Sequence, residues 1–116
     1  MYRIFAAVII FVLSFSAVAH DVSCNRPERN MVLGKAPVSI EALERIGVNF
    51  AKRNAAAPQV PFAYAHKDWL RVRALHKSGD RFVPYKYTWA NGDTLSTGYA
   101  LMRGPCLVAV LGLSIT

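Results

Sequence analysis

Cationic and aromatic side chains are interleaved along residues 69–89, and this is the clearest pattern in the chain for binding a ligand. Guanidinium and ammonium groups attract anions, and aromatic rings stack on planar or apolar groups. The pattern therefore predicts a basic, aromatic-interleaved face that recognises an acidic partner. The candidate binding residues are Trp69, Arg71, Arg73, Lys77, Arg81, Tyr85 and Lys86.

The same stretch also has a purely structural interpretation. Tyr85, Tyr87 and Trp89 follow Val83 at every second position, as residues on one face of a strand do. These rings can be the core face of that strand, with the cations solvated around it. The sequence leaves both interpretations open.

Metal binding or catalysis would depend on three histidines, His20, His66 and His76. A chain that begins at His20 offers its amine and imidazole together, a pair that chelates Cu(II), and either of the other two can add a second imidazole. His66 also lies two residues before Asp68, where acid–base chemistry would be sought. A small periplasmic hydrolase or a metal-binding protein is therefore the alternative function.

Several features of the sequence argue against that alternative. The chain has no zinc-ligand spacing, no glycine-rich phosphate loop and no Gly-x-Ser-x-Gly turn. Glu41 and Glu44 fit the start of a helix, and Asp80 and Asp93 fit turns. We therefore expect a non-catalytic protein that needs neither a metal nor a cofactor.

The first 19 residues are typical of a secretory signal peptide. Arg3 supplies the positive charge, residues 4–15 are apolar, and residues 17–19 form a small-x-small cleavage site. The apolar run is shorter than the roughly 20 residues of a membrane span. The sequence predicts cleavage before His20, one domain over residues 20–116, a periplasmic or secreted location, and no stable membrane insertion afterwards.

The full chain has a net charge of +7, and removal of Arg3 with the signal peptide leaves +6, which indicates what kind of partner the domain meets. Strong positive charge favours contact with anionic surfaces. An exported protein rarely meets nucleic acid, so an acidic protein or an envelope polyanion is the expected partner. These observations predict a non-catalytic binding or accessory module, inhibitor-like or immunity-like, that uses its basic face.

Cys24 and Cys106 are the two cysteines of the chain. An even number of cysteines in a small exported domain favours a disulfide. A bond between them would close a loop of about 80 residues and contribute on the order of 4 kcal/mol in the chain-entropy model.

Two helices are expected. Ser39 as N-cap, acids in the first turns, and Lys52 and Arg53 in the last turn predict a helix over residues 40–54. Gly47 either weakens this helix or allows another group to pack closely. Residues 66–78 fit both a strand and a helix, and the helix is favoured because Asp68 and Gly79 suit its two ends.

Strands are expected over residues 82–89, 99–103 and 106–115, with residues 20–36 as an arm held at Cys24. Pro84 cannot donate to a ladder, so its strand should lie at a sheet edge or carry a bulge. The last strand is apolar on both faces, which predicts a central position with a helix covering at least one side. The fold class is α+β: one or two helices on a small, mostly antiparallel sheet, tied by one disulfide.

The C-terminal half resembles small uncharacterised exported bacterial α+β proteins. The similar segments are residues 69–85, with Gly79-Asp80 after the presumed helix, and residues 98–109, with Gly98-Tyr99 and Gly104-Pro105-Cys106. Residues 91–97 depart from the connection usual in that group. The resemblance implies a helix-on-sheet fold and a helix over residues 66–78, and it implies no activity.

Overall fold

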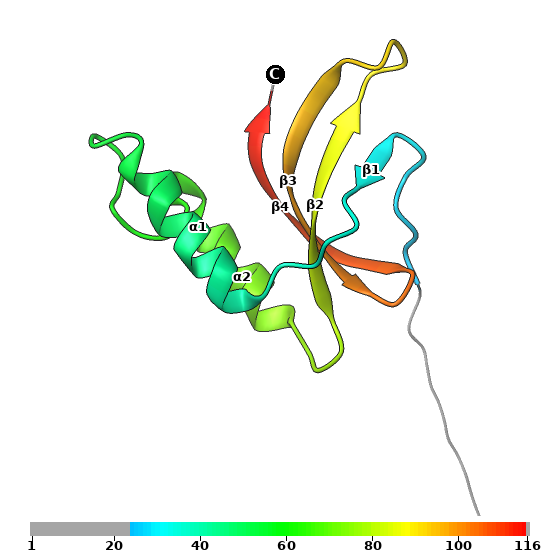
Figure 1. Cartoon of the computed structure of the whole chain (residues 1–116), viewed down its shortest axis with the longest axis horizontal. Coiled ribbons are helices and arrows are strands. Elements are labelled where there is room, and N and C mark those ends of the chain that lie inside the picture. The colour runs from blue at the N-terminus through cyan, green and yellow to red at the C-terminus, as the bar shows by residue number, and fades with distance from the viewer. Residues whose placement is uncertain (1–23, 116) are drawn as a thin grey trace, which may run out of the picture.

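Two helices lie against one face of a four-stranded antiparallel sheet in the computed structural model, which describes residues 24–115 (Figure 1). The predicted signal peptide and the cleavage position before His20 lie outside these residues. The elements in chain order are β1 (Met31–Leu33), α1 (Ile40–Lys52), the short 3-10 helix η1 (Ala63–Ala65), α2 (His66–Leu75), β2 (Arg81–Thr88), β3 (Thr94–Arg103) and β4 (Cys106–Ile115). The predicted α+β class is confirmed. Within the described part of the chain, neither helix has the length and apolar character of a membrane span.

Helix α1 begins and ends as its local sequence predicts. The Ser39 hydroxyl accepts a hydrogen bond from the Ala42 amide at 3.0 Å and so satisfies one free donor of the first turn. Leu43, Gly47 and Ala51 are buried at intervals of four residues, which places them on one side of the helix. The helix ends at Lys52, two residues before the predicted boundary.

Close packing at Gly47 joins α1 to the connection that follows it. Phe62, in the left-handed region with φ of 67°, donates its backbone N–H to the Gly47 carbonyl at 2.9 Å. A Cβ at Gly47 would lie 2.8 Å from the Phe62 ring. The glycine therefore allows the close approach that was one of its two predicted roles.

Residues 66–75 form a helix, which confirms the favoured prediction for this segment. Trp69 and Val72 are fully buried, and Leu70 is 40% exposed. Apolar and basic residues alternate in this segment, as they would in a strand. The apolar residues Leu70 and Ala74 of that alternation face solvent, so it does not form a buried face. The buried side chains follow the period of a helix instead.

The main core fills the space between the helices and the sheet. Its buried members are Leu43, Phe62, Trp69, Val72, Phe82, Leu101 and Leu111. A second buried cluster lies on the opposite face of the sheet and consists of Met31, Val83, Tyr85, Ala100 and Met102. Both faces of the sheet are therefore apolar.

The sheet order β1-β2-β3-β4 corrects the predicted place of the last strand. β4 pairs with β3 alone and is an edge strand, although its bounds match the prediction. Its residues are apolar on both sides because each face of the sheet packs into a core, and this holds at the edge as well as at the centre.

β2 is an interior strand, so the predicted edge position of Pro84 is also wrong. β1, which lies in the segment expected to be an arm, pairs only with Tyr85–Tyr87. The Pro84 carbonyl accepts a hydrogen bond from the Gly34 amide at 2.7 Å, just past the end of β1. The Pro84 nitrogen, which carries no hydrogen, therefore faces the same side of β2, toward β1. An irregularity in pairing does occur in β2, at Tyr87/Thr88.

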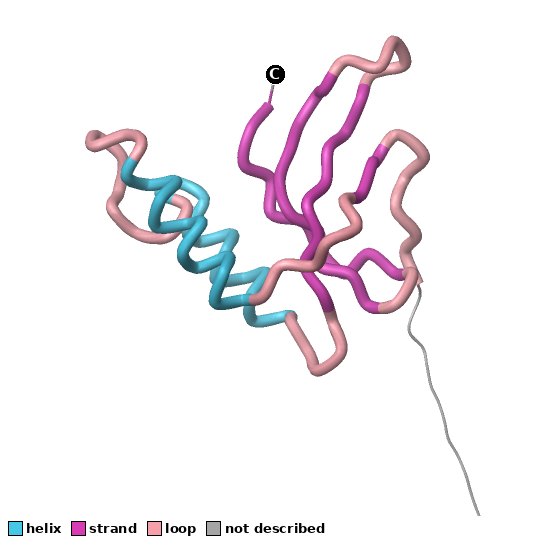
Figure 2. The backbone as a smooth tube through the Cα atoms, in the orientation of Figure 1, coloured by secondary structure: helices cyan, strands magenta, loops and turns pink. Residues whose placement is uncertain are grey.

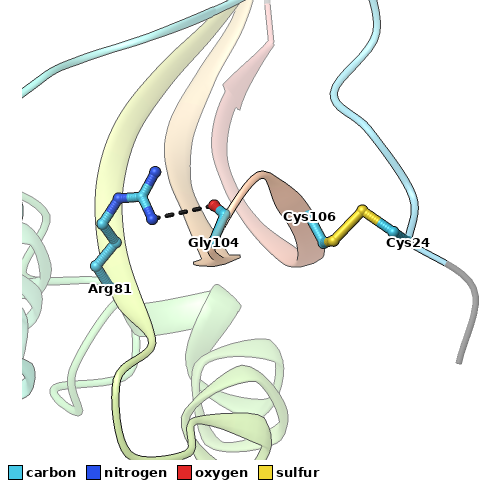
Figure 3. Close-up of a disulfide and its surroundings, with 4 residues drawn as sticks. All are labelled: Cys24, Arg81, Gly104 and Cys106. Carbon is cyan, nitrogen blue, oxygen red and sulfur yellow. Dashed lines mark hydrogen bonds between the residues drawn. A yellow bond between two sulfur atoms is a disulfide. The ribbon is translucent and has the colours of Figure 1, made fainter.

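The disulfide between Cys24 and Cys106 confirms the predicted pairing (Figure 3). It joins the N-terminal arm to the first residue of β4 across a sequence separation of 82, with the Cα atoms 5.0 Å apart. The Leu107 amide also donates to the Asn25 carbonyl at 2.6 Å. The arm therefore runs beside the turn between β3 and β4 (Figure 2).

We expect Gly47→Ala to lower the free energy of unfolding by up to about 2 kcal/mol. Alanine improves helix propensity by about 1 kcal/mol, but overpacking against the buried Phe62 ring costs roughly 1–3 kcal/mol. Urea unfolding measures the balance. Val48→Ala, at an exposed position of the same helix, is the control and should change stability by less than about 0.5 kcal/mol. A more stable Gly47→Ala variant would contradict the packing argument.

Replacement of both Cys24 and Cys106 by serine should lower stability by on the order of 4 kcal/mol, because the bond restricts a long loop in the unfolded chain. Urea unfolding of the oxidised protein and the double variant gives the difference. A loss below about 1 kcal/mol would show that the arm is held without the bond.

Candidate functional site

A cleft of about 570 Å³ opens between α1 and the helix-facing side of the sheet. Ile46, Phe50 and Arg53 line it from α1 and the residue that follows, and all four strands contribute to the opposite wall. In Figure 1 the helices and the sheet diverge toward the end that holds the C-terminus of β4. The cleft therefore occupies the part of the helix–sheet interface that the main core does not fill.

Periodicity in α1 and β2 explains which side chains reach the cleft. Ile46, Phe50 and Arg53 are spaced by four and three residues and share one side of the helix, next to its buried side. Lys86 lies four residues after the core residue Phe82, so both are on the helix-facing side of β2. The two walls thus carry a cation each, Arg53 and Lys86.

Apolar groups make up most of the remaining lining. Phe50 and Ile46 face Tyr99 and Leu113 across the cleft. The hydroxyls of Thr97 and Ser114, also in the lining, lie 2.7 Å apart and bond to each other. Cavities of this size with few polar groups are typical of sites for small ligands or single anchoring side chains.

The two cations of the cleft lack acidic partners. Neither Arg53 nor Lys86 forms an ion pair with any carboxylate among residues 24–115. The Arg53 guanidinium instead lies 5.8 Å from the centre of the Phe50 ring. An anion that entered the cleft would meet two uncompensated positive charges beside an apolar surface.

Two of the predicted arginines, Arg71 and Arg73, are paired with carboxylates of the fold. Arg71 lies 3.6 Å from Asp68 on the exposed side of α2. Arg73 pairs with Glu44 of α1, and its guanidinium lies 5.8 Å from the centre of the Trp69 ring. Arg73 therefore joins the two helices.

The remaining predicted cations come from different parts of the structure. Lys77 and Arg81 lie on either side of the turn that links α2 to β2. Arg81 donates to the Gly104 carbonyl at 3.1 Å (Figure 3). Lys86 is the one predicted cation that lines the cleft.

The predicted aromatic binding residues are buried. Trp69 has no exposed surface and packs between Phe62 and Phe82, with ring centres 5.5 and 5.8 Å away. Tyr85 is 6% exposed in the cluster on the opposite face, where burial raises the pKa of its hydroxyl, and it is also among the residues that line the cleft. For these two rings the structural interpretation holds, and neither offers a stacking surface.

Trp89 departs from that structural interpretation. It lies past the end of β2, in the hairpin that leads to β3, and is 55% exposed. The face predicted from the alternation therefore ends at Tyr87, because the strand itself ends at Thr88.

The two histidines within residues 24–115 are held by nearby backbone. His66 Nδ1 lies 2.9 Å from the Pro61 carbonyl oxygen, and His76 Nε2 lies 3.2 Å from that of Asp80. The His76 ring also stacks on Phe82. Three side chains that could ligate one metal do not come together in this part of the chain. His20 lies outside the described residues.

Asp80 is the most strongly perturbed carboxyl group. It accepts from Arg103 Nε and Nη2 at 2.9 and 2.7 Å and from the Lys77 amide at 2.9 Å. The Arg103 hydrogen bonds are the main reason that the pKa of Asp80 falls from 3.8 to about 2. This ion pair joins the turn before β2 to the end of β3.

Arg53 is the functional candidate that sequence reasoning missed. The sequence assigns it to the last turn of a helix, where a cation is favoured by the helix dipole. Its position three residues after Phe50 was the available signal, since that spacing places a cation beside a ring on one side of a helix.

Comparison of the chain with protein-family models, with curated proteins and with solved structures finds no match. The resemblance of the C-terminal half to small exported bacterial proteins therefore stays a prediction. The candidate site rests on its own geometry.

Acidic conditions should remove the contribution of Asp80 to stability. Because its pKa is lowered in the fold, the stabilisation is complete above the unfolded pKa of 3.8 and is lost as the pH falls toward about 2. We expect Asp80→Asn to cost about 1–3 kcal/mol at pH ~7, since charge-assisted hydrogen bonds are lost. Urea unfolding should show this cost shrinking between pH ~4 and ~2.

Asp68→Asn is the matched control, because its ion pair with Arg71 is exposed and such pairs contribute little. A cost of Asp80→Asn that stays constant across the acid range would contradict the assignment of the lowered pKa.

Proposed function

We propose that this protein is an exported, non-catalytic binding module that takes an acidic segment of another protein into the cleft between α1 and the sheet. The observation that carries the proposal is the pair of cations, Arg53 and Lys86, without acidic partners among residues 24–115 and set beside an apolar lining. The Cys24–Cys106 disulfide supports export, since such bonds persist in oxidising compartments.

The lining favours a segment that is apolar as well as acidic. Burial of one leucine or phenylalanine side chain against Phe50 and Leu113 contributes roughly 1.5–3 kcal/mol to the free energy of binding. A neighbouring carboxylate can then pair with Arg53 or Lys86, which are exposed at the cleft, through a charge-assisted hydrogen bond. A purely polyanionic partner, such as an acidic glycan, would leave the apolar wall uncovered. The cleft therefore favours the protein partner over the envelope polyanion.

Anchoring of this kind fits an inhibitor-like or immunity-like accessory role. Such a role needs recognition and no chemistry: a rigid groove, a buried anchor from the partner, and charges that select the right sequence. The sheet and α1 supply the two walls of the groove, and their relative position is set by the main core beneath it.

A set of short fluorescent peptides tests the proposal. Each peptide carries one phenylalanine or leucine among glutamates, and each has a matched analogue with glutamine in place of glutamate. We expect the acidic peptides to bind and the glutamine analogues to bind at least about tenfold more weakly, a difference of about 1.4 kcal/mol. Fluorescence anisotropy measures both, and binding should weaken as salt rises past ~0.15 M.

Charge reversals locate the site. Arg53→Glu and Lys86→Glu should each weaken acidic-peptide binding by about tenfold or more, because each turns an attraction into a repulsion. Arg71→Glu and Lys77→Glu, outside the cleft, are the matched controls and should change binding by less than about twofold. The opposite ranking would assign binding to the α2 region and overturn the cleft. Thermal melting of each variant confirms that it is folded.

A further inference from the structure

The outer edge of β4 lacks charged residues and prolines, two of the features that commonly protect an edge strand. Exposed edges in natural proteins commonly carry charged residues or prolines, which prevent pairing with another chain. β4 is the outermost strand opposite β1, and its ten residues include neither (Figure 1). This is unusual in a chain with a net charge of +7.

The direction of the backbone hydrogen bonds of β2 is the first step in finding which N–H and C=O groups of β4 point away from β3. The Phe82 carbonyl accepts from Val38 at 2.8 Å, on the β1 side of the strand. Backbone groups of successive residues alternate in direction along a strand, so those of Val83 face β3. Val83 lies opposite Ala100 of β3.

The same alternation continues across β3. Residues 99 and 101 turn their backbone groups toward β4, where they lie opposite Leu111 and Ala109. Val110 lies between these two, so its N–H and C=O turn away from β3. Gly112 is two residues further along and turns outward in the same way.

α2 and η1 pack against β4, but few backbone hydrogen bonds from residues 24–115 reach its outer edge. The Leu107 amide donates to Asn25 at the start of the strand, and no other backbone hydrogen bond from residues 24–115 reaches the outer side of β4. Register shifts at Thr97/Gly98 and Leu101/Met102 leave residues 109–112 as the regular stretch between them. The outward groups of Val110 and Gly112 are therefore the ones available for pairing.

We propose that β4 pairs antiparallel with β4 of a second copy of this chain, about a two-fold axis at Leu111. Val110 of each copy would lie opposite Gly112 of the other, and their N–H and C=O groups would form four hydrogen bonds. The two four-stranded sheets would join into one continuous sheet. The interface is isologous, as in most dimers, because the same stretch serves both sides.

Charge favours a second copy over the acidic partner of the cleft. An acidic strand at this edge would meet no cation from β4, whereas two uncharged edges meet without unpaired charges. Gly112 also leaves room for the Val110 side chain opposite it. The proposal is independent of the proposed function, and the two respond to salt in opposite directions. Screening weakens binding of an acidic peptide and strengthens association of two positively charged copies.

Sedimentation equilibrium of the disulfide-bonded protein tests the proposal. We expect a monomer–dimer equilibrium that shifts toward dimer when salt rises from ~0.05 to ~0.5 M. A wild-type protein that stays monomeric at the highest protein concentration under both conditions would overturn it. Hydrogen exchange gives a local readout, since the amides of Val110 and Gly112 should gain protection as protein concentration rises.

Gly112→Lys is the main variant, because it places a charge on the edge while the new Cβ would meet only the Tyr85 hydroxyl, at 3.4 Å. We expect it to weaken dimerisation by at least about tenfold. Val48→Lys, at an exposed position of α1, is the matched control and should leave dimerisation unchanged. Val110→Pro, which removes an outward N–H, is the second variant, and circular dichroism checks the fold of each. Dimerisation that survives Gly112→Lys, or that is lost equally in Val48→Lys, would overturn the proposal.

Discussion

The position of the helices depends on the packing of Phe62 against Gly47. That contact brings a buried ring within 2.8 Å of where a Cβ of residue 47 would lie, and the same ring meets Trp69, which in turn meets Phe82. Three aromatic rings thus connect α1, through α2, to β2. Any side chain larger than a hydrogen atom at residue 47 would push α1 away from this connection. The glycine that weakens the helix locally is what allows the helix to join the sheet.

The cleft follows from where this core ends. The ring connection and the Arg73–Glu44 ion pair hold α1 and α2 together, and Phe82 holds them to the sheet. Ile46 and Phe50 pack against the margin of this core and also line the cleft, where they face the sheet. Apolar groups that would otherwise be buried are left in contact with solvent there, and this makes the cleft the part of the described surface best suited to gain free energy by binding.

The charges of the molecule divide its described surface into regions that suit different partners. Arg71, Arg73 and Arg103 are engaged with carboxylates of the fold, and their charge is locally compensated. Arg53 and Lys86 are not compensated, and they lie at an apolar cavity. The β4 edge has no charge at all. An acidic segment and an uncharged strand are therefore suited to different places, so one small domain has room for a partner and for a second copy of itself.

Local chemistry in the sequence was sufficient to predict both helices, β2 and β4, but it missed β1 and predicted only residues 99–103 of β3. Ser39 and Glu41 act within one turn of α1, and the turn at Gly104 precedes the start of β4, so short-range preferences determine where these elements begin. The disulfide followed from a count of two cysteines. α2 was favoured by its ends, and its buried side chains then followed the helical period. What these predictions share is that the interacting groups are close in sequence or have no alternative partner.

Strand order, β1 and the cleft depended on long-range pairing. β1 has three residues, too few to show periodicity, and it exists because Leu33 and Met31 pair with Tyr85 and Tyr87 more than 50 positions away. The apolar faces of β4 gave no information about its neighbours, since a two-sided core makes an edge strand look central. Arg53 and Lys86 are on different elements, and local patterns do not specify how distant elements pack. Their meeting at one cavity was therefore decided by tertiary packing, because the free energy that places a helix on a sheet comes from buried contacts between residues far apart in the chain.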